Sequence, residues 1–372
     1  MRVLLVEPSG QRGLAHYVYG LGNALAARRH EVTLLTAIGH ETAELTEAYR
    51  VMEVFARFRT DPIRLGRSLL TLSQERFDVV HFHGAIHPEV YAPFLWVVRR
   101  VLRCPIVYTA HDLLPLKGPL ARGAIGPLLT GPLTRFVYRQ ASAVLVHAHE
   151  NRERLLRRFS LRPETVHVIP FGNYCFMETL VDAEVSALGP EVRTALFFGI
   201  IVESKGLMDL IRAFRGVAAR LPSSRLLIVG QPFEDCGPYR DEIERLGLRD
   251  RVVAEFRYVP LAEVPRYFRS ADVVVLPYRD ASQSAVLQVA YAFGRPVVAT
   301  SVGGLRETVL HRQSGILVPP GDTRALTDAL VEILSDDVIR LRMGAEARAL
   351  ARERHSWDRV VAMTEDIYTR AT

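Results

Sequence analysis

The sequence predicts an α/β protein built from two doubly wound, Rossmann-like domains with a cleft between them. At 372 residues the chain exceeds the size at which one hydrophobic core stops growing, which favours two domains. Short β-branched runs alternate with longer helical patterns. The runs are almost continuously apolar, as expected of parallel strands that are buried on both faces.

The first series of elements starts at the N-terminus with the apolar run "RVLLVEP". We expect strands over residues 2–8, 31–37, 78–84, 105–111, 143–148 and 166–172. The patterns between them predict helices near residues 14–29, 62–76, 88–102, 128–140 and 149–158. Strands separated by helices in this way form parallel sheets.

A second series of the same kind begins at "TALFFGI". We expect strands over residues 194–200, 225–231, 252–257, 273–278, 296–300 and 315–320. Helices are expected near residues 206–220, 237–247, 261–270, 283–293, 304–311 and 323–334. Residues 336–370 form a long, mostly polar helical tail that is free to pack back across the domain boundary.

Residues 173–190 interrupt the alternation and end in Gly-Pro, so we interpret them as a linker. The predicted N-terminal domain spans residues 1–175 and the C-terminal domain residues 190–352, with a helix over 353–372 packing back on the first domain. Ligands of doubly wound folds bind beyond the carboxyl ends of the strands, which makes the crevice between the domains the expected site.

Cysteine usage and hydropathy indicate the cellular compartment in which we expect the protein. Cys104, Cys175 and Cys236 lie far apart with no C-x-x-C spacing, which fits a reducing compartment and excludes a zinc ribbon. The N-terminus has a strand pattern rather than that of a signal peptide, and no apolar stretch reaches the ~20 residues that span a bilayer. We expect a cytoplasmic protein that is at most peripheral on the inner membrane face.

Positive charge is concentrated in the first half of the chain. Residues 1–180 hold 22 Lys and Arg against 15 Asp and Glu, whereas the whole chain has a net charge of +6. This excess is either a solvated basic surface or an attraction to an anionic membrane. Residues 113–140, apolar and basic without an acid, are either an acceptor-side loop and helix or a patch that touches the bilayer. No nucleic-acid-binding motif is present.

The loop "EPSGQRGLAHY" after the first strand is the first candidate site. It contains Gly10 and Gly13 without the G-x-G-x-x-G spacing, and the second strand ends without an acid, so nicotinamide binding is disfavoured. The two glycines either form a tight turn or let backbone amides approach a ligand at the helix N-terminus, near His16.

Histidines follow two of the predicted strands. "HFHG" and "TAHD" place His81, His83 and His111 at or near strand ends. A single histidine there is more often a hydrogen-bonded structural residue. Two strands that deliver histidine to the same rim favour a functional role.

Lysine is rare in this arginine-rich chain, which contains Lys117 and Lys205 and no other lysine. An ammonium is a compact partner for phosphate and is not interchangeable with a guanidinium. Lys205 is followed by Gly206 at a helix start just beyond a strand. This pattern predicts a contact with a diphosphate.

The segment "LPYRDASQSAVLQVAYAFGRPVV" places polar residues before an apolar helix. Ser282, Gln283 and Ser284 precede the helix, whose free amides and positive dipole end suit a phosphate. A capped core helix without a ligand is the alternative. The Gly303-Gly304 pair before the next helix predicts a second set of backbone donors, with Glu307 as the acid near it.

Taken together, these motifs resemble the retaining GT-B glycosyltransferases of family four over nearly the whole chain. The resemblance is carried by the ordered segments "DVVHFHG", "TAHDLLP", "VIPFGN", "FFG…KG…LIRAF", "LIVGQ", "YFRSADVVVLPY", "AFGRPVVATSVGG…E", "SGILVPPGD" and "HSWDRV". It implies a nucleotide sugar held mainly by the C-terminal domain and an acceptor held by the N-terminal one. It also implies that no metal or cofactor is required.

The resemblance assigns roles by position. The expected catalytic residues are Lys205, which would neutralise the diphosphate, His111, close to the transferred sugar, and Glu307, the acid after the double glycine. The expected donor-binding residues are Gly199, Lys205, Gly206, Tyr278, Ser282, Gln283, Ser284, Val286, Leu287, Gly303 and Gly304. The expected acceptor-side residues are Gly13, His16, His83 and His111.

The sequence departs from the family at its E-x7-E pair, where Ala281 and Val289 stand in place of the two glutamates. Asp280 and Gln288 are one residue off, and one helical step is about 100° of rotation, so they are not simple substitutes. The arginine usual before the lysine is also absent. The chain resembles a branch with S-Q-S-x-V-L-Q in place of the acids, in which helix-end amides and polar side chains take over the donor contacts.

The implied function is transfer of a sugar from a nucleotide-diphosphate sugar to a glycan or lipid-linked acceptor, with retention, in polysaccharide or glycoconjugate assembly. Two alternatives remain open. One is a GT-B nucleotide-sugar epimerase or hydrolase. The other, motivated by the missing acids, is an inactive pseudo-glycosyltransferase that scaffolds a glycan-assembly complex.

Overall fold

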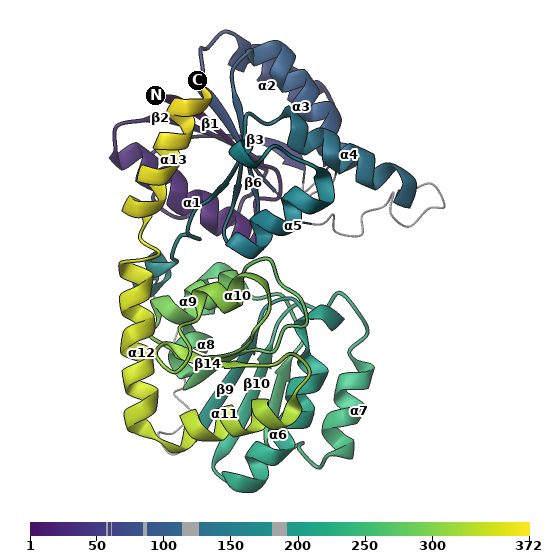
Figure 1. Ribbon diagram of the computed structural model, residues 1–372, viewed down its shortest axis with the longest axis vertical. Helices are drawn as coiled ribbons and strands as arrows, with labels where there is room; N and C mark the ends of the chain where they lie inside the picture. The colour runs from purple at the N-terminus through teal and green to yellow at the C-terminus, as the bar shows by residue number, and fades with distance from the viewer. Residues whose placement is uncertain (57–58, 61, 85–87, 114–125, 181–191) are drawn as a thin grey trace. The chain divides into compact units, whose positions relative to one another are not determined.

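The computed structural model describes residues 1–56, 59–60, 62–84, 88–113, 126–180 and 192–372 (Figure 1). These residues form two compact units. The first unit combines Met1–Gly172 with Trp357–Thr372, and the second is Asn173–Ser356. Each unit is a doubly wound α/β sheet, which confirms the predicted fold class. None of the described helices is both long and apolar enough to cross a membrane.

The sheet of the first unit has eight strands in the order β4-β3-β2-β1-β5-β6-β7-β8. All neighbours pair in parallel except β3 and β4, which are antiparallel. The strands are β1 (Arg2–Glu7), β2 (Glu31–Ala37), β3 (Arg50–Ala56), β4 (Arg59–Thr60), β5 (Val79–Gly84), β6 (Ile106–Ala110), β7 (Ala143–Val146) and β8 (Val166–Val168). The sequence did not predict β3 and β4, because β3 lies near the sheet edge and has only two buried residues, Val54 and Phe55, instead of a continuous apolar run.

The described residues of the first unit include six α-helices. They are α1 (Arg12–Ala27), α2 (Pro62–Ser73), α3 (Pro88–Leu102), α4 (Gly126–Gln140), α5 (His149–Phe159) and α13 (Trp357–Ala371). The main core lies between the sheet and α2 to α5, where side chains such as Phe82, Leu95 and Tyr138 are fully buried. On the other side, α13 packs along α1 (Figure 1).

The second unit has a six-stranded parallel sheet in the order β11-β10-β9-β12-β13-β14. Its strands are β9 (Arg193–Phe198), β10 (Ser224–Val229), β11 (Val252–Glu255), β12 (Val273–Leu276), β13 (Val297–Thr300) and β14 (Gly315–Val318). Its helices are α6 (Leu207–Arg220), α7 (Gly237–Arg245), α8 (Val264–Ser270), α9 (Ala285–Ala292), α10 (Gly303–Thr308), α11 (Thr323–Ser335) and α12 (Asp337–Arg352).

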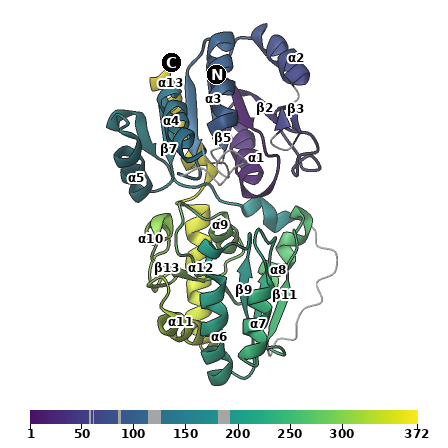
Figure 2. The same cartoon turned by 90° about the vertical axis from the view of Figure 1, so that its right-hand side faces the viewer.

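Helices cover both faces of this second sheet (Figure 2). Alternate residues of β9, such as Ala195 and Phe197, join the core formed with α6, α7 and α11. Successive strand residues point to opposite faces, so Leu196 lies on the face covered by α8 and α9. The predicted helix over 261–270 is divided into a 3-10 turn, Leu261–Glu263, and α8.

Both sheets reverse their strand order once, between β1 and β5 in the first unit and between β9 and β12 in the second. In doubly wound sheets ligands bind beyond the carboxyl ends of the strands at such a point. The loops after these four strands are therefore where each unit is expected to hold a ligand.

Part of the predicted linker, residues 181–190, lies outside the described residues. The part that is described contains a 3-10 helix, Cys175–Thr179, and belongs to the second unit.

The C-terminal tail contains two helices, and the predicted helix over 353–372 corresponds to the second of them, which begins at Trp357. Helix α12 ends at Arg352 in the second unit, and α13 begins at Trp357 in the first. The Trp357 ring packs on two glycines, where a Cβ on Gly20 would lie 2.3 Å from the ring and one on Gly172 would lie 2.4 Å from it. This close packing fixes where α13 begins, which the helical periodicity of the tail did not reveal.

Adding a methyl group at Gly20 should destabilise the first unit, because the Trp357 ring has to move to admit it. We expect Gly20→Ala to lower the free energy of unfolding by about 1–3 kcal/mol. Both tryptophans of the chain, Trp96 and Trp357, belong to the first unit, so denaturant titration followed by tryptophan fluorescence reports on this unit. Gly66→Ala is the control: no atom lies within 4 Å of its Cβ position in α2, and we expect a gain of about 0.5–1 kcal/mol.

Candidate active site

The loops after β9 and β12 lie against each other at the switch point of the second unit. Gly199 follows β9 with φ 121°, and a Cβ there would lie 3.4 Å from Val286 of α9. Gly206 has φ 68°, and a Cβ there would lie 1.9 Å from the carbonyl oxygen of Pro277, after β12. A residue other than glycine at 206 would push these loops apart, so Gly206 is required for the position of Lys205 beside the β12 loop.

The Lys205 ammonium lies over the ring of Tyr278, with Nζ 3.8 Å from the ring centroid. The nearby carboxylates are engaged elsewhere, because Glu203 and Asp209 pair with Arg279 at 3.2 and 3.1 Å. Within the described part of the chain, no carboxylate forms an ion pair with Lys205. A cation held by an aromatic face keeps its charge available to an anion.

Helix α9 begins at the same tyrosine. Ser284 caps the helix: its hydroxyl accepts from the Leu287 N–H at 3.2 Å and lies 3.3 Å from the Tyr278 hydroxyl. The buried Tyr278 side chain therefore holds Lys205 on its ring face and the positive end of α9 at its hydroxyl. Of the predicted donor residues, Leu287 already uses its N–H in the cap, and its side chain is fully buried.

The double glycine packs against the segment before α9. A Cβ on Gly303, which has φ 45°, would lie 1.7 Å from the Ala281 carbonyl oxygen. The Gly304 N–H donates to the Ser282 carbonyl at 3.3 Å. The prediction that both glycines offer free backbone donors is therefore wrong for Gly304, because its donor is used within the loop. Glu307 lies on α10 with a partly exposed side chain.

The two positions that carry glutamates in the family are packed inside the protein. Ala281 and Val289 are 7% and 5% exposed. Gln288, one residue away, is fully buried with its Nε2 3.4 Å from His355 Nδ1, whereas Asp280 is exposed. The structure confirms that Gln288 does not take the place of the missing acid.

In the first unit, three histidines and one carbonyl form a chain at the carboxyl ends of β5, β6 and β7. His83 Nδ1 lies 3.4 Å from His111 Nε2, and His111 Nδ1 lies 3.4 Å from His147 Nε2. His147 Nδ1 lies 3.3 Å from the carbonyl oxygen of Ile169. A carbonyl only accepts, so His147 Nδ1 donates. In neutral rings His111 Nδ1 then donates to His147, and His83 Nδ1 donates to His111.

Two members of this cluster were not predicted from the sequence. His147 directly follows β7, as His111 directly follows β6, and the same signal of a histidine after an apolar run marks it in "AVLVHA". The ring of Tyr17 lies 4.7 Å from His111 and 5.4 Å from His147 between centroids. Tyr17 is fully buried, and its hydroxyl has no hydrogen-bond partner among the described residues.

Burial sets the protonation of the histidines. It is the main cause that lowers the pKa of His81, His83 and His111 well below the ordinary value, and the charges of neighbouring histidines lower it further. His81 is held by the Tyr368 hydroxyl at 2.6 Å and the Thr109 hydroxyl at 2.7 Å. His111 is therefore a neutral imidazole near pH 7.

The glycine loop after β1 is a turn held by carboxylates. Gly10 has φ 63°, and its N–H donates to Glu7 at 2.7 Å. Glu7 is buried, which raises its pKa, and it also accepts the Ser9 N–H at 2.8 Å. Glu41 accepts the N–H of Arg12 at 2.7 Å and lies 3.1 Å from His16 Nε2. These loop amides are bonded within the protein, which favours the tight-turn interpretation over a ligand cradle.

Gly13 lies in the first turn of α1, next to this loop. Among the described residues, no group of three or more His, Cys, Asp or Glu side chains is arranged to hold a metal ion.

Comparison with known proteins agrees with this arrangement. Residues 11–172 match the family described as Glycosyltransferase Family 4, and residues 192–336 match the one described as Glycosyl transferases group 1. A D-inositol 3-phosphate glycosyltransferase from Xylanimonas cellulosilytica is 31% identical over 319 residues, which cover 81% of this chain and 73% of that protein. The chain belongs to the family 4 glycosyltransferases of group 1.

Solved structures show the fold of this glycosyltransferase. A sucrose-phosphate synthase from Thermosynechococcus elongatus superposes with a TM-score of 0.76 at 22% identity, over 100% of this chain and 98% of that one. Anabaena Alr3699/HepE, in complex with UDP-glucose, superposes with a TM-score of 0.74 at 20% identity, over 100% and 99%. The two Rossmann-like domains are those of the GT-B fold.

The lowered histidine pKa values should make the first unit sensitive to acid. Below the unfolded-state pKa of about 6.5, the unfolded chain binds protons that the buried histidines do not, so stability falls as the pH falls. We expect a loss of up to about 1.4 kcal/mol per pH unit for each of His81, His83 and His111. The pKa of His40 is raised, mainly by its hydrogen bond to Glu47, so protonation of His40 raises the stability of the folded state as the pH falls.

Denaturant titration at pH 7.5 and 5.5, followed by tryptophan fluorescence, measures this dependence. His83→Gln removes one titrating group and should make the dependence shallower. An equal or higher stability at the lower pH contradicts the assignment of neutral buried histidines.

Proposed function

We propose that this glycosyltransferase moves a sugar from a nucleoside-diphosphate sugar to a glycan or lipid-linked acceptor, with retention of configuration. The observation that carries the proposal is the Lys205 ammonium, held on the Tyr278 ring beside the Ser284-capped start of α9. An ammonium without a carboxylate partner next to a helix N-terminus suits a diphosphate. UDP-glucose, named with the Anabaena neighbour, is the first donor to test.

The charges that develop during sugar transfer suggest a role for each group of this proposed site. As the bond between the anomeric carbon and the diphosphate breaks, negative charge builds on the leaving phosphate and positive charge on the sugar ring. Lys205 and the amides at the start of α9 stabilise the first of these charges, because they are already oriented toward it. Ser282 and Gln283, which precede the cap, supply polar contacts in place of the missing glutamates.

Glu307 is the proposed acid near the sugar, and His111 and His83 belong to the proposed acceptor side with Gly13 and His16. Both ring nitrogens of His111 are bonded to His83 and His147, so its proposed part is to present a neutral ring to the sugar without adding positive charge near the developing oxocarbenium ion. Retention follows when the acceptor hydroxyl attacks from the face that the diphosphate leaves. We expect the reaction to need no cofactor, as the family resemblance implies.

Removing the Lys205 ammonium should weaken donor binding. We expect Lys205→Ala to raise the dissociation constant for UDP at least about tenfold, equivalent to about 1.4 kcal/mol, because the diphosphate loses its cationic partner. Isothermal titration calorimetry with UDP measures the change. Arg215→Ala, on the exposed side of α6, removes one positive charge elsewhere and should bind UDP as the wild type does.

Two results would overturn this assignment. If Lys205→Ala binds UDP with wild-type affinity, the diphosphate lies elsewhere. If the folded wild-type protein binds neither UDP nor other nucleoside diphosphates, the inactive scaffold is favoured. Release of nucleotide without any acceptor would favour the hydrolase alternative.

Removing the His111 imidazole should affect transfer more than donor binding. We expect His111→Ala to lower kcat/KM about tenfold or more while the affinity for UDP stays within twofold, because the proposed contact of the neutral ring with the reacting sugar is lost. His167→Ala, on β8 outside the histidine chain, is the matched control. Full turnover by His111→Ala would exclude a catalytic role and leave the donor site unaffected.

A further inference from the structure

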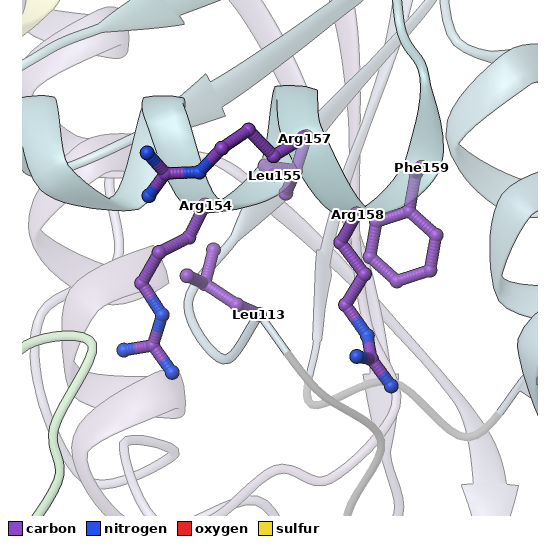
Figure 3. A pocket seen from close by; sticks show the side chains of 6 residues that line it. All are labelled: Leu113, Arg154, Leu155, Arg157, Arg158 and Phe159. Atoms are coloured by element: carbon purple, nitrogen blue, oxygen red, sulfur yellow. The ribbon is translucent and has the colours of Figure 1, made fainter.

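Apolar side chains are well buried over most of the described chain, including those beside its pockets. Figure 3 shows a pocket of about 310 Å³ in the first unit. Its apolar lining residues are each at most 5% exposed, and they are Leu113, Leu155 and Phe159. This pocket therefore offers little apolar surface to a partner. Exposed apolar surface lies instead on one helix of the second unit.

Helix α12 carries the two most exposed large apolar side chains among the described residues. Val338 is 76% exposed and Leu341 is 69% exposed. Ala345 is exposed about one turn further along the helix, and Ala349, another turn along, is partly exposed. The spacing of three, four and four residues places all four on one stripe of the helix. Single exposed apolar residues are common, whereas a continuous stripe of them indicates an interaction surface.

This stripe lies opposite the face that α12 buries within the second unit. The inward side chains include Met343, Ala347 and Ala351. A Cβ on Gly344 would lie 2.4 Å from the carbonyl oxygen of Gly294 in the loop after α9, so the backbones are in close contact there. Figure 1 shows α12 along the outer margin of the second unit. The outward stripe is therefore left open.

Fraying at the helix end does not account for the exposure of the stripe. Asp336 caps α12, since its side chain accepts the Val338 N–H at 2.8 Å. The next residue, Asp337, pairs with Arg340 at 2.7 Å. Val338 and Leu341 therefore project from a well-anchored first turn, and their exposure is a property of the folded helix.

Charged residues of both signs border the stripe. Arg342 and Glu346 lie on one side of it and Arg348 on the other. Within the described residues, neither Arg342 nor Glu346 forms an ion pair. Helices that lie on a bilayer carry mainly Lys and Arg on their polar face, so this mixed border disfavours an anionic membrane. It suits a surface with the same mixture of charges.

We propose that two copies of this chain pair through α12 in antiparallel orientation, about a two-fold axis that passes near Ala345. Leu341 of one copy then packs on Ala349 of the second copy, so a large side chain meets a small one at both ends of the contact. Arg342 comes within about 3 Å, along the helix axis, of Glu346 of the second copy, and this ion pair forms twice. Parallel pairing would instead place Arg342 beside Arg342.

A single pair of helices forms a small interface. Helix α12 has 16 residues and is therefore about 24 Å long. Contacts of this size fall at the weak end of those between proteins, so we expect a reversible dimer with a dissociation constant in the micromolar range. The proposal uses no residue of the proposed donor site or of the histidine chain, and it stands whether or not the proposed function holds.

Sedimentation velocity of the full-length protein over a range of concentrations tests the pairing. The wild type should change reversibly from monomer to dimer as its concentration rises. Leu341→Glu should raise the dimer dissociation constant at least about tenfold, because it places a carboxylate in the apolar contact. Leu70→Glu, at a leucine of α2 that is 65% exposed, is the matched control and should dimerise as the wild type does.

Charge reversal tests the orientation of the two helices. Arg342→Glu places two carboxylates together and should weaken the dimer about threefold or more, and Glu346→Arg should do the same with two cations. The double variant with both changes restores opposite charges across the contact. Its dissociation constant should return to within about twofold of the wild-type value.

Cross-linking tests the position of the axis. Ala345→Cys should form a disulfide-linked dimer on mild oxidation, because its two copies meet at the axis. The two copies of residue 349 lie about 12 Å apart along the helix axis, so Ala349→Cys should not link to itself. The wild type, with Cys104, Cys175 and Cys236, gives the background.

Four outcomes would overturn the proposal: a wild type that stays monomeric, a dimer that Leu341→Glu does not weaken, a charge swap that does not restore pairing, or association that continues beyond the dimer, which indicates a heterologous contact. A monomer that sediments with lipid vesicles through Leu341 would identify a bilayer as the occupant and also overturn it. UDP affinity should be equal in the wild type and Leu341→Glu. A failure here is thus distinguished from a failure of the donor site.

Discussion

The second unit is organised around one constraint, which is to hold a cation beside the positive end of a helix without neutralising it. Tyr278 meets this constraint with its ring under Lys205 and its hydroxyl at the Ser284 cap of α9. A carboxylate in the same place would compete with a diphosphate for the ammonium, whereas an aromatic face does not. Arg279 keeps the nearby acids occupied, and Gly206 allows the lysine turn to pack on the β12 loop.

The same constraint bears on the two positions that carry glutamates in the family and have none here. Ala281 and Val289 fill their positions with small apolar side chains that are packed inside the protein. Without acids, the start of α9 keeps its full positive potential, and the double glycine fits closely over Ala281 and Ser282. In the proposed donor site, an ammonium and peptide dipoles meet the diphosphate charge without the two glutamates of the family.

The first unit follows a different principle, since its polar groups are neutral and mutually bonded. The Ile169 carbonyl fixes the tautomer of His147, and through it that of His111 and His83. Burial keeps these rings uncharged, so the histidine cluster carries no positive charge.

Features that depend on local pattern were readable from the sequence. The buried parallel strands, the crossover helices, and Lys205 beside Gly206 at the end of a strand all have short-range signals, because strand and helix periods and turn residues act over a few positions. Tertiary contacts decided the rest. Strand β3, next to the edge strand, lacks a continuous apolar run. Helix α13 starts where Trp357 meets Gly20 and Gly172, and the Gly304 N–H bonds to the Ser282 carbonyl. Each of these features depends on contacts between residues that are far apart in the sequence, or on which backbone N–H groups are already hydrogen-bonded. The periodicity of a short segment carries no information about such contacts.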